Sequence, residues 1–279
     1  MISHFLSFIR FSHTIFALPF ALGSMFVAAH GLPSFRVFAL VVLAMVFART
    51  AAMTFNRLVD WEIDKRNPRT AGRHKLVSKR MAIGACLISA LFFSATASMI
   101  NPLCFALSPV ALVIVFFYSL TKRFTHGAQF FLGLALAVAP IGAWIAVTGS
   151  LAMPPLVLGA SVLCWVAGFD IIYATQDLEV DRREGLHSVV VWLGVPRALA
   201  LATLLHAFAL TGFLFFGAIA RLGPVYFVGL GLVGVGLVYE NLLAIKGTVA
   251  AINKAFFQVN AAVSAIFVLT ILVDQLVAR

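Results

Sequence analysis

Two short segments of this chain carry carboxylates at a repeating spacing. Asp60 and Asp64 lie four residues apart in the first segment, and Asp177 and Asp181 lie four apart in the second. Residues four apart on a helix share one face, with roughly 5–6 Å between their Cβ atoms. Two carboxylates at that distance repel each other unless a cation lies between them. Because Mg²⁺ binds through one or two carboxylates together with substrate phosphates, each pair predicts a Mg²⁺ site.

The acids of the chain are concentrated in these two segments, which hold eight of the ten. The eight are Asp60, Glu62, Asp64, Asp170, Asp177, Glu179, Asp181 and Glu184. Only Glu240 and Asp274 fall elsewhere. The alternative interpretation is a solvated helix end, where acids and bases mark the water interface. Acids near a helix C-terminus oppose the macrodipole, however, so a solvated end does not explain why they gather there.

The elements that position the acids are apolar. The chain is 62% hydrophobic and 11% charged, whereas soluble domains carry about a quarter charged residues. Apolar runs long enough to span a bilayer recur along its length, which predicts an all-α integral membrane protein, a single domain over residues 1–279. Nine transmembrane helices around a central cavity are expected. They cover residues 12–30, 37–57, 81–100, 103–120, 129–148, 154–177, 196–219, 223–245 and 256–276.

The basic residues predict the orientation of these helices. If the N-terminus is cytoplasmic, sixteen of the twenty Lys and Arg residues lie in cytoplasmic segments and three lie outside, while Arg49 falls within a helix. This bias is typical of multi-pass proteins and predicts the cell inner membrane, with the N-terminus and both acidic segments on the cytoplasmic side. The first apolar run exceeds the 7–15 residues of a usual signal-peptide core, so it is interpreted as a helix.

The formal net charge of +10 does not indicate nucleic acid binding, because the bases lie in short loops between apolar runs and form no separate basic domain. The three cysteines, Cys86, Cys104 and Cys164, all lie within apolar runs and form no CxxC pair, which is typical of small core residues.

A transporter is disfavoured because the acids gather at one face and no inverted repeat with broken midplane helices is visible. The D-G-x-x-A-R signature of phosphatidyltransferase-type membrane enzymes is absent.

Three stretches resemble motifs of the UbiA superfamily of intramembrane prenyltransferases. The stretch NRLVDWEID, which begins at Asn56, is similar to that family's N-R-x-x-D-x-x-x-D motif. The stretch DIIYATQDLEVDRREG, which begins at Asp170, is similar to its second motif, D-x-x-Y-A-x-Q-D-x-x-x-D. The stretch YSLTKRFT, from Tyr118 to Thr125, resembles a third stretch of the 4-hydroxybenzoate branch. The three matches occur in order and cover most of the chain.

The resemblance implies a reaction and its ligands. An allylic polyprenyl diphosphate binds through Mg²⁺ to the two acidic motifs and loses diphosphate, and an aromatic ring attacks the resulting allylic carbocation. The implied acceptor is 4-hydroxybenzoate in ubiquinone synthesis, with a different acceptor in menaquinone synthesis as the alternative. No protein partner is inferred. The residues implied as catalytic metal ligands are Asn56, Asp60, Asp64, Asp177 and Asp181.

Other residues are candidates for substrate binding. Arg57 and Lys122 lie at the face of the acidic motifs, where cations stabilise a departing diphosphate, with Lys122 preferred because of the third stretch. Arg123 beside it is a further candidate for the same role, with an ordinary cytoplasmic loop residue as the favoured alternative. Tyr118 and Tyr173 are expected either to face the carbocation with their π systems or to serve as interfacial aromatics.

Arg49 and Asp170 occupy mirrored places, each seven residues before a motif position at Asn56 or Asp177. An arginine within a span is costly and usually functional. Arg49 is expected to bind an anionic group of the acceptor, such as a benzoate carboxylate. The structural alternative is a buried ion pair, with Asp170 as a possible partner.

Overall fold

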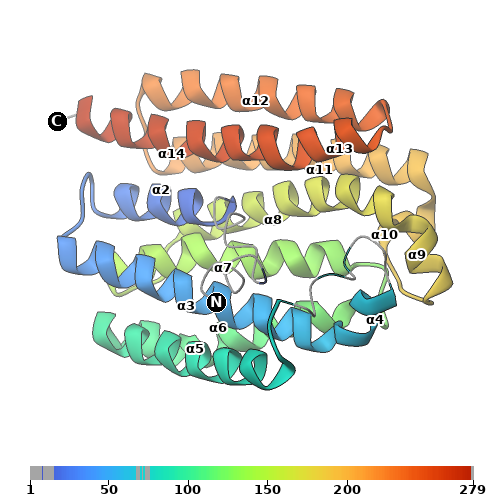
Figure 1. The fold of residues 1–279 in the computed structure, drawn as a ribbon. Coiled ribbons are helices and arrows are strands. Elements are labelled where there is room, and N and C mark those ends of the chain that lie inside the picture. Colours follow the sequence, from blue (N-terminus) through green and yellow to red (C-terminus); the bar gives the residue numbers. More distant parts are fainter. Residues whose placement is uncertain (1–7, 9–15, 67–69, 71, 73–75, 278–279) are drawn as a thin grey trace.

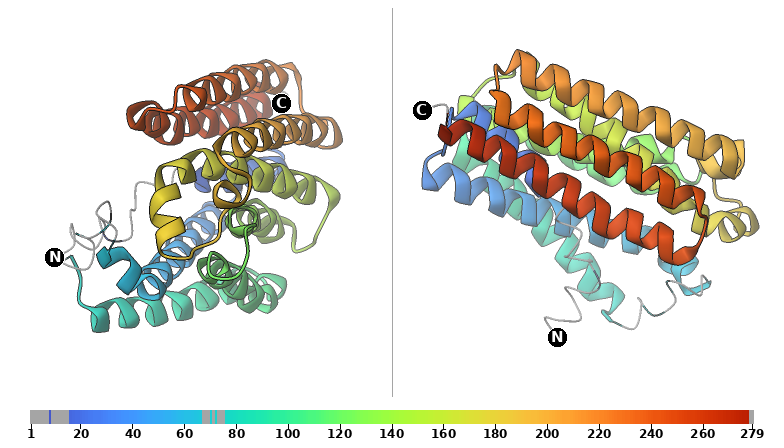
Figure 2. Two further views of the ribbon diagram at one scale, coloured as in Figure 1. Left: turned by 90° about the vertical axis from the view of Figure 1, so that its right-hand side faces the viewer. Right: turned by 90° about the horizontal axis from the view of Figure 1, so that it is seen from above.

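The computed structural model of the chain describes residues 8, 16–66, 70, 72 and 76–277, and its regular elements within these ranges are helices. Eight helices are long and apolar enough to cross a membrane, and they lie side by side in one bundle (Figures 1 and 2). These spans are α3 (Phe35–Val59), α5 (Lys79–Ile100), α6 (Pro102–Thr121), α7 (Ala128–Thr148), α8 continuing into α9 (Met153–Arg183), α11 (Val195–Ile219), α12 (Pro224–Ile245) and α13 continuing into α14 (Val249–Val277).

The helix that precedes these spans is shorter than the sequence predicts. Of the expected range 12–30, the structure describes helix α2 over Leu18–Ala28, which is 11 residues. A bilayer requires about 20 residues of helix, so α2 alone does not meet the length of a span. Most of α2 is buried, and it packs between α7 and α14. The expected count of nine helices is therefore approximate.

The predicted breaks between helices have visible causes. Asn101 caps α6, with its Oδ1 accepting a hydrogen bond from the backbone N–H of Cys104 at 2.8 Å, and Pro102 occupies the first turn. Side chains of Ser34 and Ser78 cap the starts of α3 and α5 in the same way. Each cap satisfies a backbone donor that the first helical turn leaves unpaired.

The helices that carry the two acidic motifs end close to the predicted boundaries at residues 57 and 177, and a separate short helix follows each of them. Helix α3 ends at Val59, Asp60 is its C-cap, and the short helix α4 (Trp61–Arg66) follows. In the second motif, α8 (Met153–Ala174) gives way to the 3-10 turn η3 (Thr175–Asp177) and then to α9 (Leu178–Arg183).

These breaks correct one sequence argument. Asp64 lies in the first turn of α4 and Asp181 in the first turn of α9, so both carboxylates face the favourable end of a helix dipole. The expectation that they oppose the dipole of a long helix is wrong. The spacing itself is kept, because the backbone N–H of Asp64 donates to the carbonyl of Asp60 at 2.7 Å.

Aromatic rings build the core in the C-terminal half of the bundle. The ring of Phe20 on α2 contacts three others, with centroid distances of 4.8 Å to Trp165, 5.6 Å to Phe213 and 4.6 Å to Phe267. All four side chains are buried. They tie α2 to α8, α11 and α14, so α2 is held in the bundle interior.

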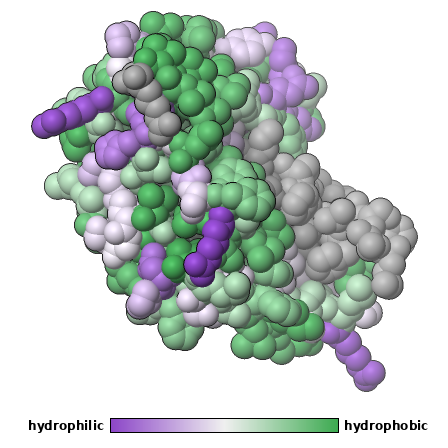
Figure 3. All heavy atoms as spheres, turned by 90° about the vertical axis from the view of Figure 1, so that its left-hand side faces the viewer, coloured by the Kyte–Doolittle hydropathy of each residue, from purple (hydrophilic) through white to green (hydrophobic). Residues whose placement is uncertain are grey.

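The two ends of the bundle differ. The short helices α4 and α9 lie at the same end, on the right in Figure 1. The opposite end, seen in Figure 3, is mostly hydrophobic with separate hydrophilic side chains. A buried acid, Asp274, lies near that end and caps α12, because its carboxylate accepts from the backbone N–H groups of Gly223 at 2.8 Å and Tyr226 at 3.3 Å. Asp274 is thus accounted for as a helix cap.

Candidate active site

The first acidic motif is held by two arginines. Arg57, which is buried, lies with its Nη1 3.6 Å from Oδ2 of Asp64 and donates to Oδ1 of Asn56 at 3.4 Å. Arg123, from the segment after α6, lies 3.3 Å from Oδ1 of Asp60 and donates to the carbonyl of Val59 at 2.8 Å. Arg57 therefore orients the motif from within α3, and Arg123 orients it from a neighbouring element.

Lys122 lies between the two motifs. It is the C-cap of α6. Its ammonium interacts electrostatically with Asp60 of the first motif and with three carboxylates of the second, Asp170, Asp177 and Asp181. Burial lowers the pKa of Lys122, but the four carboxylates together outweigh that effect and hold the pKa above its usual value. The Lys122 side chain therefore carries a positive charge at neutral pH, as its predicted role at the diphosphate site requires.

Three of the four motif carboxylates are buried. The exposed fraction is 9% for Asp64, 8% for Asp177 and 4% for Asp181, whereas Asp60 is half-buried. Burial raises the pKa of Asp60, an effect that Lys122 opposes, Asp64 reinforces and Arg123 opposes, and the pKa stays above its usual value. Burial of the Asp60 carboxyl is therefore the main reason for its raised pKa, and the two bases oppose it.

Two further contacts join the motifs to each other. Nη2 of Arg66, on α4, lies 3.0 Å from Oε2 of Glu184, which follows α9. The backbone N–H of His187 donates to the carbonyl of Lys122 at 2.7 Å, which ties the segment after α6 to the segment after the second motif. Figure 2 shows α4 and α9 next to each other at this end of the bundle.

The donor set fits Mg²⁺, which prefers oxygen ligands. Asp60, Asp64, Asp177 and Asp181 supply carboxylate oxygens from two sides of one basic centre. Among the described residues, no three His, Cys, Asp or Glu side chains form a cluster that could hold a metal ion alone. This arrangement suits an ion whose remaining ligands are waters and substrate phosphates.

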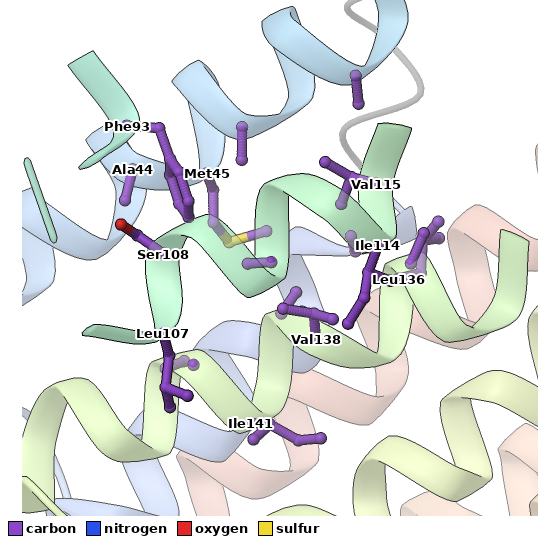
Figure 4. Close-up of a pocket in the computed structure, with 18 of the residues that line it drawn as sticks. Ala44, Met45, Phe93, Leu107, Ser108, Ile114, Val115, Leu136, Val138 and Ile141 are labelled. Atoms are coloured by element: carbon purple, nitrogen blue, oxygen red, sulfur yellow. The ribbon is translucent and has the colours of Figure 1, made fainter. Parts of the chain in front are cut away.

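A cavity of about 410 Å³ runs between α3, α5, α6 and α7 and reaches the site through Arg49 and Tyr118. Figure 4 shows its apolar lining, with Met45 from α3, Phe93 from α5, and Leu107 and Ile114 from α6 among the side chains around it. Such a cavity suits a long apolar group.

Arg49 and Tyr118 belong to the lining of the cavity. Arg49 projects from α3 and Tyr118 from α6, and they lie within electrostatic range of each other. Tyr118 also lies within electrostatic range of Arg57 and Asp60, so it is the lining residue that relates the cavity to the first motif. Asp170 lies within electrostatic range of Lys122. The grouping of Arg49 with the first motif stays a prediction.

Tyr173 has a different neighbourhood from Tyr118. Its ring stacks on Phe256 with a centroid distance of 4.1 Å and meets Phe257 edge-on at 6.2 Å. Both phenylalanines come from the π-helical turn η4 (Ala255–Val259), more than 80 residues away in the sequence. The sequence contained no spacing signal for this contact.

Sequence reasoning left Arg123 between a candidate for diphosphate binding and an ordinary loop residue, and in the structure it contacts the carboxylate of Asp60. The ion pair between Arg66 and Glu184 was not predicted. Arg66 lies just after the first acidic segment, and Glu184 is the last acid of the second. Arg69 and Arg73, in the basic loop that follows the first motif, are further candidates for diphosphate binding with a solvated loop as the favoured alternative, and both lie outside the described residues.

Known proteins resemble this chain over most of its length. Residues 17–262 match the model of the UbiA prenyltransferase family. The 4-hydroxybenzoate octaprenyltransferase of Shewanella pealeana is 31% identical over 220 residues, which cover 77% of this chain and 76% of that protein. The 4-hydroxybenzoate solanesyltransferase of Synechocystis is 32% identical over 227 residues, which cover 80% and 77%.

Solved structures share the fold. The apo structure of a UbiA homolog from Aeropyrum pernix K1 superposes with a TM-score of 0.86 at 31% identity, covering 94% of this chain and 98% of that one. A UbiA homolog from Archaeoglobus fulgidus bound to GPP and Mg²⁺ superposes with a TM-score of 0.69 at 21% identity, covering 97% and 99%.

Proposed function

The chain belongs to the UbiA prenyltransferase family, and we propose that it transfers a polyprenyl group from an allylic polyprenyl diphosphate to 4-hydroxybenzoate. The observation that carries the proposal is the position of Lys122, which faces carboxylates of both acidic motifs at one end of an apolar cavity. The named relatives from Shewanella pealeana and Synechocystis support the acceptor. A menaquinone-type acceptor is the alternative, since the same donor site would serve it.

The donor binds with its diphosphate among Lys122, Arg123 and the carboxylates of both motifs. Asp60, Asp64, Asp177 and Asp181, with Asn56, would hold Mg²⁺, which when bound neutralises charge on the departing oxygens. Lys122 adds a fixed positive charge to the same oxygens. The four carboxylates alone would repel a diphosphate. The site therefore suits a diphosphate that binds together with Mg²⁺.

The prenyl chain lies in the cavity. Its apolar lining excludes water from the allylic carbocation that forms when the donor C–O bond breaks. Tyr118, in the cavity wall beside the motifs, presents a π face that stabilises positive charge. The acceptor ring then forms the new C–C bond, a ring proton is released, and diphosphate is the second product.

Arg49 holds the acceptor through its carboxylate. Its guanidinium lies at the cavity wall beside Tyr118, which places an acceptor ring near the allylic carbon. Replacing Arg49 with Ala should raise the KM for 4-hydroxybenzoate about a hundredfold and the KM for the diphosphate less than about threefold. Initial rates in membranes, with each substrate varied in turn, measure both constants. Arg36→Ala, an exposed arginine that donates to the carbonyl of Met99, is the control.

The opposite pattern, a larger effect on the diphosphate KM, would move Arg49 to the donor side of the site. Equal effects on both constants would indicate a general structural role.

Gly142 allows a test of the cavity as the chain-binding site. It lines the cavity from α7, and a Cβ added there would meet no atom within 4 Å. Gly142→Leu should therefore fill the cavity without strain, lowering kcat/KM at least about tenfold for a long polyprenyl diphosphate and little for dimethylallyl diphosphate. Gly231→Leu is the matched control, because Gly231 is also helical and equally unobstructed but exposed on α12. Loss with both donors would contradict this assignment.

The direct test of the proposed function supplies membranes containing the protein with a polyprenyl diphosphate and 4-hydroxybenzoate, with Mg²⁺ or with chelator. Mass spectrometry should detect prenylated product only when Mg²⁺ is present. Product with another aromatic acceptor, and none with 4-hydroxybenzoate, would keep the reaction and change the acceptor. No consumption of diphosphate with any acceptor would overturn the proposal.

The site faces the cytoplasm of the inner membrane in this proposal, because the bases gather at the end that carries α4 and α9. A cysteine at exposed Glu62 should react with a membrane-impermeant maleimide in inside-out vesicles and not in right-side-out vesicles. The reverse labelling would invert the orientation.

A further inference from the structure

Glu240 is the one acid of α12, and neither the acidic motifs nor helix capping accounts for it. It is fully buried, as are His206 on α11 and Asn260 on α14. Oε1 of Glu240 accepts a hydrogen bond from Nδ2 of Asn260 at 2.7 Å, and its Oε2 lies 3.9 Å from Nε2 of His206. An ionisable residue inside a membrane helix is costly and indicates a function.

Asn260 links Glu240 to an irregular turn. It directly follows the π-helical turn η4, and its Nδ2 also donates to the carbonyls of Ala255 at 3.2 Å and Phe256 at 3.3 Å. A π-turn departs from the α-helical pairing of backbone groups, and such turns are frequent at functional sites. The amide that Glu240 holds is therefore the group that binds the carbonyls of this turn.

The turn contacts the second acidic motif. The ring of Phe256 stacks on Tyr173 at 4.1 Å, and Tyr173 lies one helical turn before Asp177. Just before η4, Asn253 accepts a hydrogen bond from Nε2 of Gln176 at 3.4 Å. Both contacts fall on the residues where α8 breaks into η3, so η4 and the residue before it pack against the turn that ends at Asp177.

His206 connects the same cluster to α8 directly. A Cβ added to Gly168 on α8 would lie 2.4 Å from Cδ2 of His206, so the ring packs against the backbone of that helix. Nδ2 of Asn241 donates to the carbonyl of Leu237 at 2.8 Å, which fixes the amide, and to Nδ1 of His206 at 2.9 Å. His206 and Asn241 therefore pack the Glu240 cluster against the backbone of α8.

We propose that Glu240 is a positioning residue for the second acidic motif: through Asn260 it holds η4 so that Phe256 stacks on Tyr173 and Asp177 is aimed at the donor site. The inference rests on the proposed function for its catalytic consequence. Its structural content, the placement of η4 against α8, stands independently of the reaction.

The kinetic test compares two substitutions of one side chain. Glu240→Leu removes the acceptor for Asn260, and it should lower kcat about ten- to a hundredfold while both KM values stay within about twofold. Glu240→Gln keeps an oxygen acceptor for Asn260, and it should restore most of kcat. Asp274→Leu is the control, because Asp274 is equally buried but contacts the opposite end of α12, so kcat should be unchanged.

The structural test uses proximity and not activity. The three native cysteines are first replaced by Ala, and the substitutions Gln176→Cys and Asn253→Cys are then combined in one chain. A short bifunctional thiol reagent should cross-link the two introduced thiols. Glu240→Leu should reduce the yield at least about threefold, and Glu240→Gln should preserve it. Phe256→Leu, which removes the ring stacked on Tyr173, should reproduce the loss of kcat. If Glu240→Leu does not fold, Asn260→Ala, which removes the same Glu240–Asn260 hydrogen bond from its other side, replaces it in both tests, and unchanged kcat and cross-linking yield in this variant would overturn the proposal.

These arms separate two failures. If the wild type forms no product with any acceptor, the proposed function fails, and cross-linking still reports whether Glu240 places η4. A yield unaffected by Glu240→Leu, or a kcat loss that Glu240→Gln does not restore, would overturn the positioning role.

Discussion

Asp60→Ala and Asp177→Ala should each reduce prenyl transfer by about a thousandfold or more, while the chain still inserts and folds in the membrane. Each substitution removes a carboxylate from one of the two motifs that face Lys122. The other motif then has to hold Mg²⁺ and the diphosphate alone, and charge on the departing oxygens is left poorly balanced. Product formation at saturating Mg²⁺ and donor measures the loss.

The neighbouring acids provide matched controls. Glu62 is exposed and paired with Lys65 at 3.1 Å, and Glu179 is exposed on α9. Each lies two residues from a predicted ligand, so Glu62→Gln and Glu179→Gln change the same net charge on the same short helices. These variants should retain activity within about threefold, because exposed ion pairs contribute little. Activity that survives Asp60→Ala or Asp177→Ala would remove the metal assignment.

Lys122→Met should be the second most damaging substitution, lowering kcat/KM for the diphosphate by about a hundred- to a thousandfold. The ammonium is charged at every working pH, because its pKa lies above the usual lysine value. Its removal withdraws a cation from the departing oxygens and leaves the four carboxylates within its electrostatic range without that counter-charge. Steady-state rates with the donor varied at saturating acceptor measure the effect.

Two variants define the interpretation of that result. Lys122→Arg keeps the charge but changes its shape, and it should recover only part of the activity. Lys254→Met removes an exposed lysine that donates to the hydroxyl of Tyr239 at 2.9 Å, and it should be nearly silent. If Lys122→Met and Lys254→Met were equally mild, Lys122 would be an ordinary cytoplasmic loop residue.

The sequence by itself determined the membrane fold and the two acidic motifs. Both are local properties: long apolar runs favour spanning helices wherever they occur, and a carboxylate pair four residues apart is visible without knowledge of the fold. Breaks at Asn101 and Pro102 were predictable for the same reason, because a capping side chain and a proline act within one turn.

The breaks inside the motifs were not predictable in this way. No proline or glycine lies between Val59 and Trp61 or between Ala174 and Leu178, so no local helix breaker marks where the short helices α4 and α9 begin. The change of direction there depends on contacts with other elements, including Arg123 from the segment after α6.

Only the tertiary structure decided which distant residues share the site. Lys122 meets four carboxylates, Arg66 meets Glu184, and Glu240 reaches Tyr173 through Asn260 and Phe256. These contacts join helices that are far apart in the chain, and they depend on how the helices pack and rotate against one another. Hydrophobic helices that are apolar on all sides carry no stripe that indicates which face turns inward, so their neighbours and the cavity between them emerge only from packing.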